Sequence, residues 1–225
     1  MSDSLDHVRA FMARASGDEK HDASVRSTLE VLWMLYDRVL RYDPADPHSP
    51  ARDRFLLSKG HGPVGLYAIL AAKGFFAPDA LSDFAHQRGF LGHHPDRLLV
   101  PGIEISTGSL GHGLPLAVGT ALGLRAKGSD RRVFVLIGDG ESNEGSVWEA
   151  VILAANLGLT NLTCILINNH SSSIQVRDPV APFAAFGWDA VHAATSNQDA
   201  LYAALSTQHP QRPRAVMVDV GARGA

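Results

Sequence analysis

The sequence predicts an α/β fold in which a doubly wound, mostly parallel sheet carries helices on both faces. Two mainly apolar runs, 133–137 and 162–167, are expected to form strands. The first is continuous rather than alternating, which is typical of a parallel strand buried on both faces. Apolar residues between these runs recur at helical spacing, which predicts a helix that ends near Gly158, a residue type that favours helix C-termini. Such strand–helix–strand units build a parallel sheet, and the same alternation continues along the chain.

The remaining elements follow from the same patterns. Apolar residues between Val25 and Leu40 recur at helical spacing, and a proline-rich loop at 43–50 follows them. Small residues recur along the helix predicted at 114–127, which indicates close packing against another element. Further helices are expected at about 1–17, at 64–73, from Pro78 onward and at 198–206, and apolar strand segments at 55–57 and 215–220.

Length and composition favour one globular domain. The chain has 225 residues, of which 45% are hydrophobic and 19% charged, an ordinary globular composition. We expect a single domain over 1–225, with a short N-terminal helical extension at about 1–20. The net charge of −3 argues against a nucleic acid or an anionic membrane as partner.

The single cysteine bears on the compartment. Cys164 lies within a predicted buried strand, where a free cysteine usually serves packing. One cysteine excludes an internal disulfide bond, which favours an intracellular, cytoplasmic protein. The N-terminal residues lack the apolar core of a signal peptide, and no apolar run approaches the length of a membrane-spanning helix.

Polar side chains follow two neighbouring strands of the predicted sheet. Asp139 stands between Gly138 and Gly140 after the first strand, and Asn169 follows the second. Both should therefore lie at the carboxyl edge of the sheet, where open α/β sheets bind ligands. Carboxylate and amide oxygens suit Mg²⁺ or Ca²⁺, and Mg²⁺ commonly completes its shell with water and phosphate oxygens. The pattern predicts a metal-bridged phosphate site.

Simpler interpretations of this turn remain open on spacing alone. Asp139 would also suit a helix cap or an ordinary Asp-Gly turn, and Ser142 or Asn143 is expected to cap the following helix. A dinucleotide site is less favoured, because the third glycine, Gly145, comes two residues late for that motif. A P-loop is excluded, because no Gly-Lys-Ser/Thr follows the turn.

Three longer motifs give the chain a resemblance to a known family. Asp53–His61 reads DRFLLSKGH, Ser106–Gly113 reads STGSLGHG, and Gly138–Ala150 reads GDGESNEGSVWEA, with Asn169 placed 30 positions after Asp139. In this order, the motifs resemble those of transketolases. The resemblance implies a thiamine-diphosphate-binding fold and a bound divalent metal, Mg²⁺ or Ca²⁺.

The resemblance also implies roles for individual residues. Asp139, Asn169 and the backbone carbonyl of Ser171 would hold the metal. Glycine at 108 would let the backbone approach the cofactor ring, and Leu110 would support the bent cofactor. The residues implied for cofactor binding are His61, Gly108, Leu110, Gly138, Asp139, Gly140, Glu144 and Asn169.

Three histidines are implied to take part in the chemistry. His61 would lie near the diphosphate or the substrate, although a helix-terminal histidine with a backbone partner would explain it as well. His94 matches the family's Gly-His-Pro histidine, with His93 beside it as the alternative register. His21 matches a third histidine, but the glycines and the proline that surround it in transketolases are absent here.

Other positions depart from the family or have two explanations. The family usually has larger residues where this chain has Ser172 and Ser173, so the wall of the pocket is expected to be more open or more polar. Glu144 and Glu149 could complement the dipole of the central helix. The resemblance instead places them in a chain of glutamates that links paired active sites.

The implied activity is that of a transketolase-like transferase. In that family the cofactor carries a two-carbon ketol unit from a ketose to an acceptor, and a second, pyrimidine-binding domain supplies an activating glutamate. We expect a separate C-terminal transketolase-like subunit to supply that glutamate here, in an α2β2 heterotetramer. The alternatives are ketol or acyl transfer in specialised metabolism, another carboligase or lyase subunit, and a non-catalytic cofactor-binding regulatory subunit.

Overall fold

The computed structural model describes residues 4–15, 22–170, 172, 174 and 178–220, with only the backbone for 22–27. The chain forms two compact units, which are described separately. The first unit comprises residues 1–52 and 60–108, and the second comprises 53–59 and 109–225.

The first unit is helical. Its elements are α1 (Leu5–Met12), α2 (Asp22–Met34), the π-helical η1 (Leu35–Val39), α3 (Val64–Ala72) and the 3₁₀ helix η2 (Pro78–Asp83). Helices α1 and α2 both pack against α3, which is buried along its length. Lys73 follows the last residue of α3. It forms an ion pair with Asp37 at 2.8 Å and lies over the ring of Trp33.

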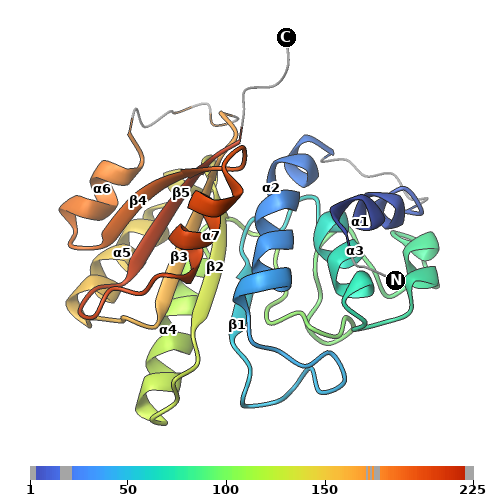
Figure 1. Ribbon diagram of the computed structural model, residues 1–225, viewed down its shortest axis with the longest axis horizontal. Coiled ribbons are helices and arrows are strands. Elements are labelled where there is room, and N and C mark those ends of the chain that lie inside the picture. The colour runs from blue at the N-terminus through green and yellow to red at the C-terminus, as the bar shows by residue number, and fades with distance from the viewer. Residues whose placement is uncertain (1–3, 16–21, 171, 173, 175–177, 221–225) are drawn as a thin grey trace. The chain divides into compact units, whose positions relative to one another are not determined.

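The second unit is built on a five-stranded parallel sheet in the order β1-β2-β3-β5-β4 (Figure 1). The strands are β1 (Arg54–Leu57), β2 (Val133–Gly138), β3 (Leu162–Asn168), β4 (Asp189–Ala194) and β5 (Arg214–Asp219). The helices are α4 (Gly113–Ala126), η3 (Glu141–Asn143), α5 (Gly145–Asn156), α6 (Val180–Ala185) and α7 (Gln198–Ser206).

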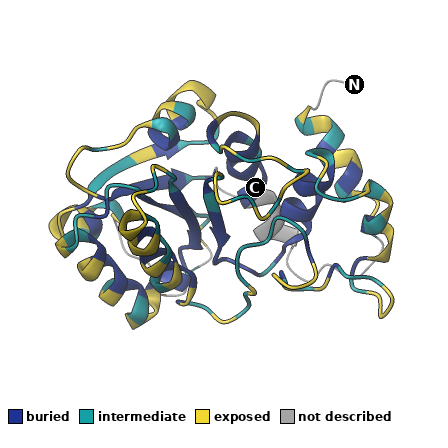
Figure 2. Ribbon diagram, turned by 90° about the horizontal axis from the view of Figure 1, so that it is seen from below, coloured by how far each residue is buried: buried dark blue, intermediate teal, exposed yellow. Residues whose placement is uncertain are grey.

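Helices cover both faces of this sheet. Helices α4 and α5 pack together and lie behind the strands in Figure 1, whereas α7 lies in front of them. Every residue of β2 is buried, and the strands are mostly dark blue in Figure 2 while the helices turn exposed residues outward. The continuous apolar run of β2 thus corresponds to a strand covered on both sides. The parallel sheet with helices on both faces confirms the predicted fold class.

Two expectations for the secondary structure were wrong or incomplete. The N-cap of α5 is Glu144, not Ser142 or Asn143, because a 3₁₀ turn intervenes and the Ser142 hydroxyl donates to the carbonyl of Asp139 at 2.6 Å. Strand β4 was not predicted. It lies at the edge of the sheet and is only partly buried, so its sequence lacks a strong apolar pattern.

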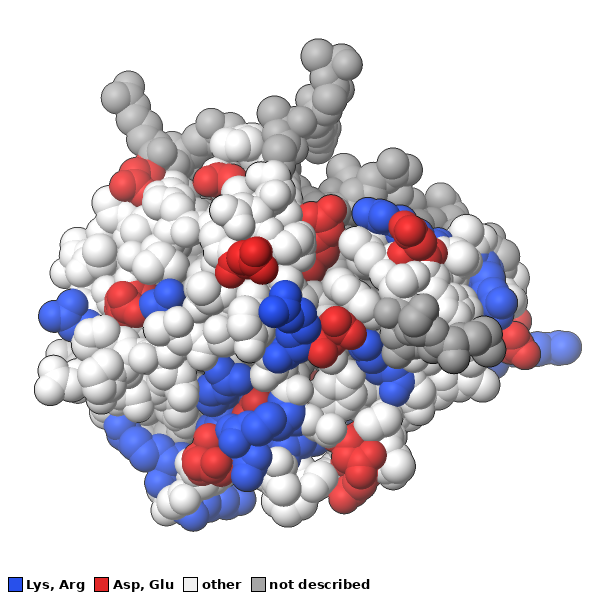
Figure 3. All heavy atoms as spheres, viewed as in Figure 1, with Lys and Arg blue, Asp and Glu red and all other residues white. Residues whose placement is uncertain are grey.

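The charge distribution and the length of the helices bear on possible partners. Basic and acidic side chains are interspersed on the face seen in Figure 3, in keeping with the small net charge of −3. Among the described residues, none of the helices is long and apolar enough to cross a membrane.

Candidate functional site

The Gly138-Asp139-Gly140 turn follows β2 at the carboxyl edge of the sheet. Strands β2 and β3 are parallel, with Gly138 opposite Ile167, and the Asp139 amide extends the ladder by donating to the Ile167 carbonyl at 3.0 Å. Asn169 comes directly after β3. The structure therefore brings Asp139 and Asn169 to the same edge of neighbouring strands.

The Asp139 carboxylate is held by backbone donors. Its Oδ1 accepts from the Gly140 amide at 2.8 Å and its Oδ2 from the Ser172 amide at 3.3 Å. The residue is 8% exposed, and a side chain at Gly140 would meet open space. Because α5 begins six residues later, at Gly145 with Glu144 as its N-cap, Asp139 does not cap that helix.

This part of the site fits a hard cation beside a phosphate group. Asp139 supplies a carboxylate and Asn169, which is half-buried, an amide, both oxygen donors of the kind Mg²⁺ prefers. The described residues contain no group of three His, Cys, Asp or Glu side chains that could hold a metal. A metal here would therefore depend on amide, carbonyl and ligand oxygens as well.

A buried cluster of charged and polar side chains lies beside this turn. We call Ser58, Lys59, Asp139 and Glu141 the anchor cluster; all four are at most 9% exposed. Burial lowers the pKa of Lys59 to about 8, while the charges of Asp139 and Glu141 act in the opposite direction. Burial also raises the pKa of Glu141, against the effect of its hydrogen bonds and of Lys59. Sequence reasoning missed Ser58, Lys59 and Glu141 as site residues, although each lies within one of the three family motifs.

The turn before α4 is packed closely against the start of α5. Gly111 has a φ of +79°, and a Cβ there would lie 2.7 Å from the Cβ of Glu144. The Ser146 hydroxyl donates to the Gly111 carbonyl at 2.8 Å. Leu110, in the same turn, is half-buried, whereas the Glu144 side chain is exposed. These contacts fix the backbone of the turn and leave the Glu144 carboxylate outside the anchor cluster.

Two histidines meet in the first unit. The rings of His61 and His94 lie edge to face, with centroids 5.2 Å apart, and we call them the histidine pair. A Cβ at Gly108, whose φ is +147°, would lie 3.1 Å from Cδ2 of His94, so the glycine is required there. His93 instead packs its ring against Phe84 at 5.5 Å. The structure thus selects His94 over its neighbour as the partner of His61.

One hydroxyl near the histidine pair is buried without a partner. A side chain at Gly60 would clash with Oγ1 of Thr107, and within the described part of the chain that oxygen has no hydrogen-bond partner. A buried group left in this state normally calls for an explanation. Sequence reasoning missed Thr107, which stands directly before Gly108 in the second motif.

Some predicted residues cannot be placed. His21, Ser171 and Ser173 lie outside the described residues. Ser172 is described: its hydroxyl accepts from the Asn143 side chain at 2.8 Å and donates to the Ile174 carbonyl at 2.7 Å. This position thus carries a small polar side chain engaged in local hydrogen bonds.

A family model and solved structures both match this chain. Residues 5–222 match the family model described as "Transketolase, thiamine diphosphate binding domain". The chain is similar to the transketolase of Leishmania mexicana, with a TM-score of 0.81 and 25% identity, over 97% of this chain and 37% of that one. It is also similar to a transketolase of Pichia stipitis, with a TM-score of 0.82 and 26% identity, over 96% of this chain and 36% of that one.

Three curated relatives are similar in sequence. "Ferredoxin fas2" of Rhodococcoides fascians is 46% identical over 99% of this chain and 74% of the relative. A subunit of the apulose-4-phosphate transketolase of Actinobacillus succinogenes is 46% identical over 67% of this chain and 54% of the relative. The SqwG subunit of the 6-deoxy-6-sulfo-D-fructose transketolase of a Clostridium species is 36% identical over 82% of this chain and 70% of the relative.

The match to the family model spans nearly the whole chain, the fold is that of transketolases, and the glycine-flanked aspartate stands at the carboxyl edge of the sheet. The chain therefore belongs to the transketolase family, in which it represents the thiamine diphosphate-binding domain.

Proposed function

We propose that this chain is the thiamine-diphosphate-binding subunit of a transketolase-like enzyme that transfers a two-carbon ketol unit from a ketose to an acceptor. The observation that carries this proposal is the Asp139 turn, placed next to Asn169 on neighbouring parallel strands. Membership of the family supports it, and two relatives named as transketolase subunits support the division into subunits.

The proposed metal is Mg²⁺ or Ca²⁺. Asp139 and Asn169 would bind it through side-chain oxygens, and Ser171 through its backbone carbonyl. Two backbone amides already hold the Asp139 carboxylate, so the ligand would need little rearrangement on binding. The metal would link these residues to the cofactor's diphosphate, since Mg²⁺ in such sites commonly binds phosphate oxygens.

The cofactor, when bound, supplies the carbanion chemistry of ketol transfer. The chain's own residues would hold it and move protons. The backbone at Gly108 and Gly140 would approach it closely, Leu110 would support its bent shape, and Gly138 and Glu144 would frame its pocket. His61 and His94 would exchange protons with substrate hydroxyls, as positioned histidines commonly do, with His21 as a further candidate.

A separate subunit would supply the glutamate that activates the cofactor. Helices α4 and α5 offer a surface for it: Leu116, Leu122, Ile152 and Leu153 are between 39% and 50% exposed. A Cβ at Gly119 or Gly123 of α4 would meet open space, so another backbone could approach there. We propose two copies of each chain in an α2β2 assembly located in the cytoplasm.

Two observations bear on the alternatives. The names of two relatives contain unusual ketoses, and Ser172 provides a small polar side chain beside Asp139; both favour an unusual donor or acceptor in specialised metabolism. A non-catalytic regulatory subunit is less favoured, because the proposed metal ligands and the histidine pair are all present. The name of the ferredoxin relative does not carry over, since iron–sulfur clusters need several cysteines and this chain has one, Cys164, which is 1% exposed.

The test is to purify the chain with whatever partner chain accompanies it, and to assay the pair and the isolated chain with Mg²⁺ and thiamine diphosphate. The donor panel should include phosphorylated and sulfonated ketoses, with release of the shortened aldose as the readout. We expect turnover by the pair and none by the isolated chain. Robust turnover by the isolated chain would contradict the divided enzyme.

A further inference from the structure

Glu141 binds three separate segments of the second unit with one carboxylate. Its Oε1 accepts from the Ser58 hydroxyl and from the Gly111 amide, the latter at 2.9 Å. Its Oε2 accepts from the Gly138 amide at 3.3 Å. The donors come from the end of β1, from the turn before α4 and from the end of β2. The residue is 2% exposed, so these bonds form away from solvent.

Ser58 extends this connection. Besides donating to Glu141, its hydroxyl accepts from the Gly113 amide at 2.9 Å. A side chain at Gly113 would clash with Ser58, which shows how closely the two segments approach. Ser58 and Glu141 together therefore link the 109–113 turn to the 138–140 turn.

Lys59 balances the charge in this buried region. The charges of Asp139 and Glu141 both favour its protonated form, and its methylene groups lie against Gly138, where a Cβ would be 3.2 Å from Cδ. A buried carboxylate needs such a counter-charge together with hydrogen bonds. The arrangement keeps a costly buried charged group two residues from Asp139.

We propose that Glu141 is a positioning residue for thiamine diphosphate: together with Ser58, it holds the 109–113 turn and the 138–140 turn at the separation that the cofactor requires. The inference rests on the proposed function. Its bond to the Gly138 amide fixes the backbone immediately before Asp139, and its bond to the Gly111 amide fixes the backbone immediately after Leu110. One side chain thus sets two of the backbone segments assigned to the cofactor.

The test is a pair of substitutions measured in the assembled enzyme. Glu141→Ala removes all three hydrogen bonds. We expect the Kd of thiamine diphosphate at fixed Mg²⁺ to rise about 10- to 100-fold, the range typical when a residue that supports a metal ligand is changed. In Glu141→Gln, the amide oxygen can still accept from Ser58 and Gly111, but the NH₂ group would face the Gly138 amide donor to donor. We expect an intermediate Kd, with kcat at saturating cofactor changed much less than the Kd.

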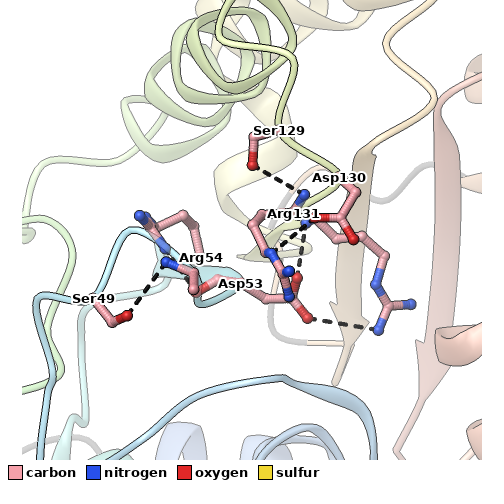
Figure 4. A network of polar contacts seen from close by, with 8 residues as sticks. Ser49, Asp53, Arg54, Ser129, Asp130 and Arg131 are labelled. Atoms are coloured by element: carbon pink, nitrogen blue, oxygen red, sulfur yellow. Dashed lines mark hydrogen bonds and ion pairs between the residues drawn. The ribbon is translucent and has the colours of Figure 1, made fainter.

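Asp53 provides the matched control, because it is also a buried carboxylate in the second unit. It links the starts of β1 and β2, at the end of the sheet away from the 138–140 turn. It is 4% exposed and belongs to the network of polar contacts drawn in Figure 4. It accepts from the Arg132 amide at 2.8 Å, just before β1 and β2 begin. Asp53→Asn and Asp53→Ala should lower the melting temperature about as much as the Glu141 variants and leave the cofactor Kd unchanged.

The outcomes separate the two proposals. A wild-type enzyme that does not bind thiamine diphosphate would contradict the proposed function itself. If the wild type binds and the Glu141 variants bind equally well at a temperature where they are folded, the positioning role is wrong. If Glu141→Ala does not fold, the comparison of Glu141→Gln with Asp53→Asn decides: a selective loss of cofactor affinity supports the role, and equal affinities overturn it.

Discussion

The anchor cluster and the histidine pair are two contrasting regions of this molecule. The anchor cluster is buried, and its carboxylates accept hydrogen bonds from several backbone amides. In the histidine pair, His61 is half-buried and His94 is exposed, and the two rings touch edge to face. The chain has therefore fixed Asp139 and the residue proposed to position the cofactor, Glu141, and has left the groups proposed to exchange protons more accessible.

This difference has a physical basis. A buried charge is tolerated only with partners, so the anchor cluster must be organised before any ligand arrives, and such preorganisation lowers the cost of binding. Proton exchange instead requires a group that can reach the substrate and change its protonation state. The comparison predicts that changes in the anchor cluster will alter cofactor affinity, whereas changes in the histidine pair will alter turnover.

The largest effect is expected for Asp139→Ala. We expect the loss of thiamine diphosphate affinity in Mg²⁺ to exceed the roughly 10- to 100-fold that follows when only a neighbour of a metal ligand is changed. Calorimetry on the assembled enzyme, with and without EDTA, measures this. The wild type should lose affinity in EDTA, and the variant should respond little to it. Undiminished affinity in the variant would contradict the assignment of the metal.

A large effect on turnover is expected for His61→Ala. General acid–base groups typically contribute about 10²- to 10⁴-fold, so kcat should fall by that order, far more than the affinity for the cofactor weakens. His86, an exposed histidine of the same unit, provides the control, and His86→Ala should leave both quantities unchanged. Equal loss of affinity and turnover in His61→Ala would remove the contrast between the two regions.

A smaller, pH-dependent effect is expected for Lys59→Met in the metal-free protein. The pKa of Lys59 falls from 10.5 to about 8 on folding, so folding favours the neutral amine. Wild-type stability relative to the variant should therefore decrease as the pH falls from about 10.5 to about 8, by roughly 1.4 kcal/mol per pH unit, and level off below. Urea denaturation between pH 7 and 10 measures this difference.

Lys59→Gln is the control for that experiment, because glutamine also lacks a titratable amine but keeps polar atoms. Both variants should show the same trend with pH relative to the wild type. A stability difference that stays flat between pH 8 and 10 would mean that Lys59 is less buried in the anchor cluster than its 9% exposure indicates.

Local sequence determined the central part of the fold and of the candidate site. The continuous apolar run of β2 and the mostly apolar run of β3 indicate strands covered on both faces, so Asp139 and Asn169 were expected to follow neighbouring parallel strands at one edge. Helices α3 and α7 were located from helical spacing within a residue or two. The alanine-rich strand β4 was not predicted, because an edge strand needs fewer apolar residues and alanine has low strand propensity.

Only the tertiary structure decided which side chains meet. Glu141 accepts from Ser58, 83 positions away, and from Gly111, 30 positions away; no local period records such contacts. Similarly, His94 rather than His93 meets His61 from a distant part of the sequence, because the chain turns one ring toward His61 and the other toward Phe84. Hydrophobic periodicity fixes which face of an element is buried, whereas the pairing of polar groups depends on how distant segments approach each other once those faces have packed.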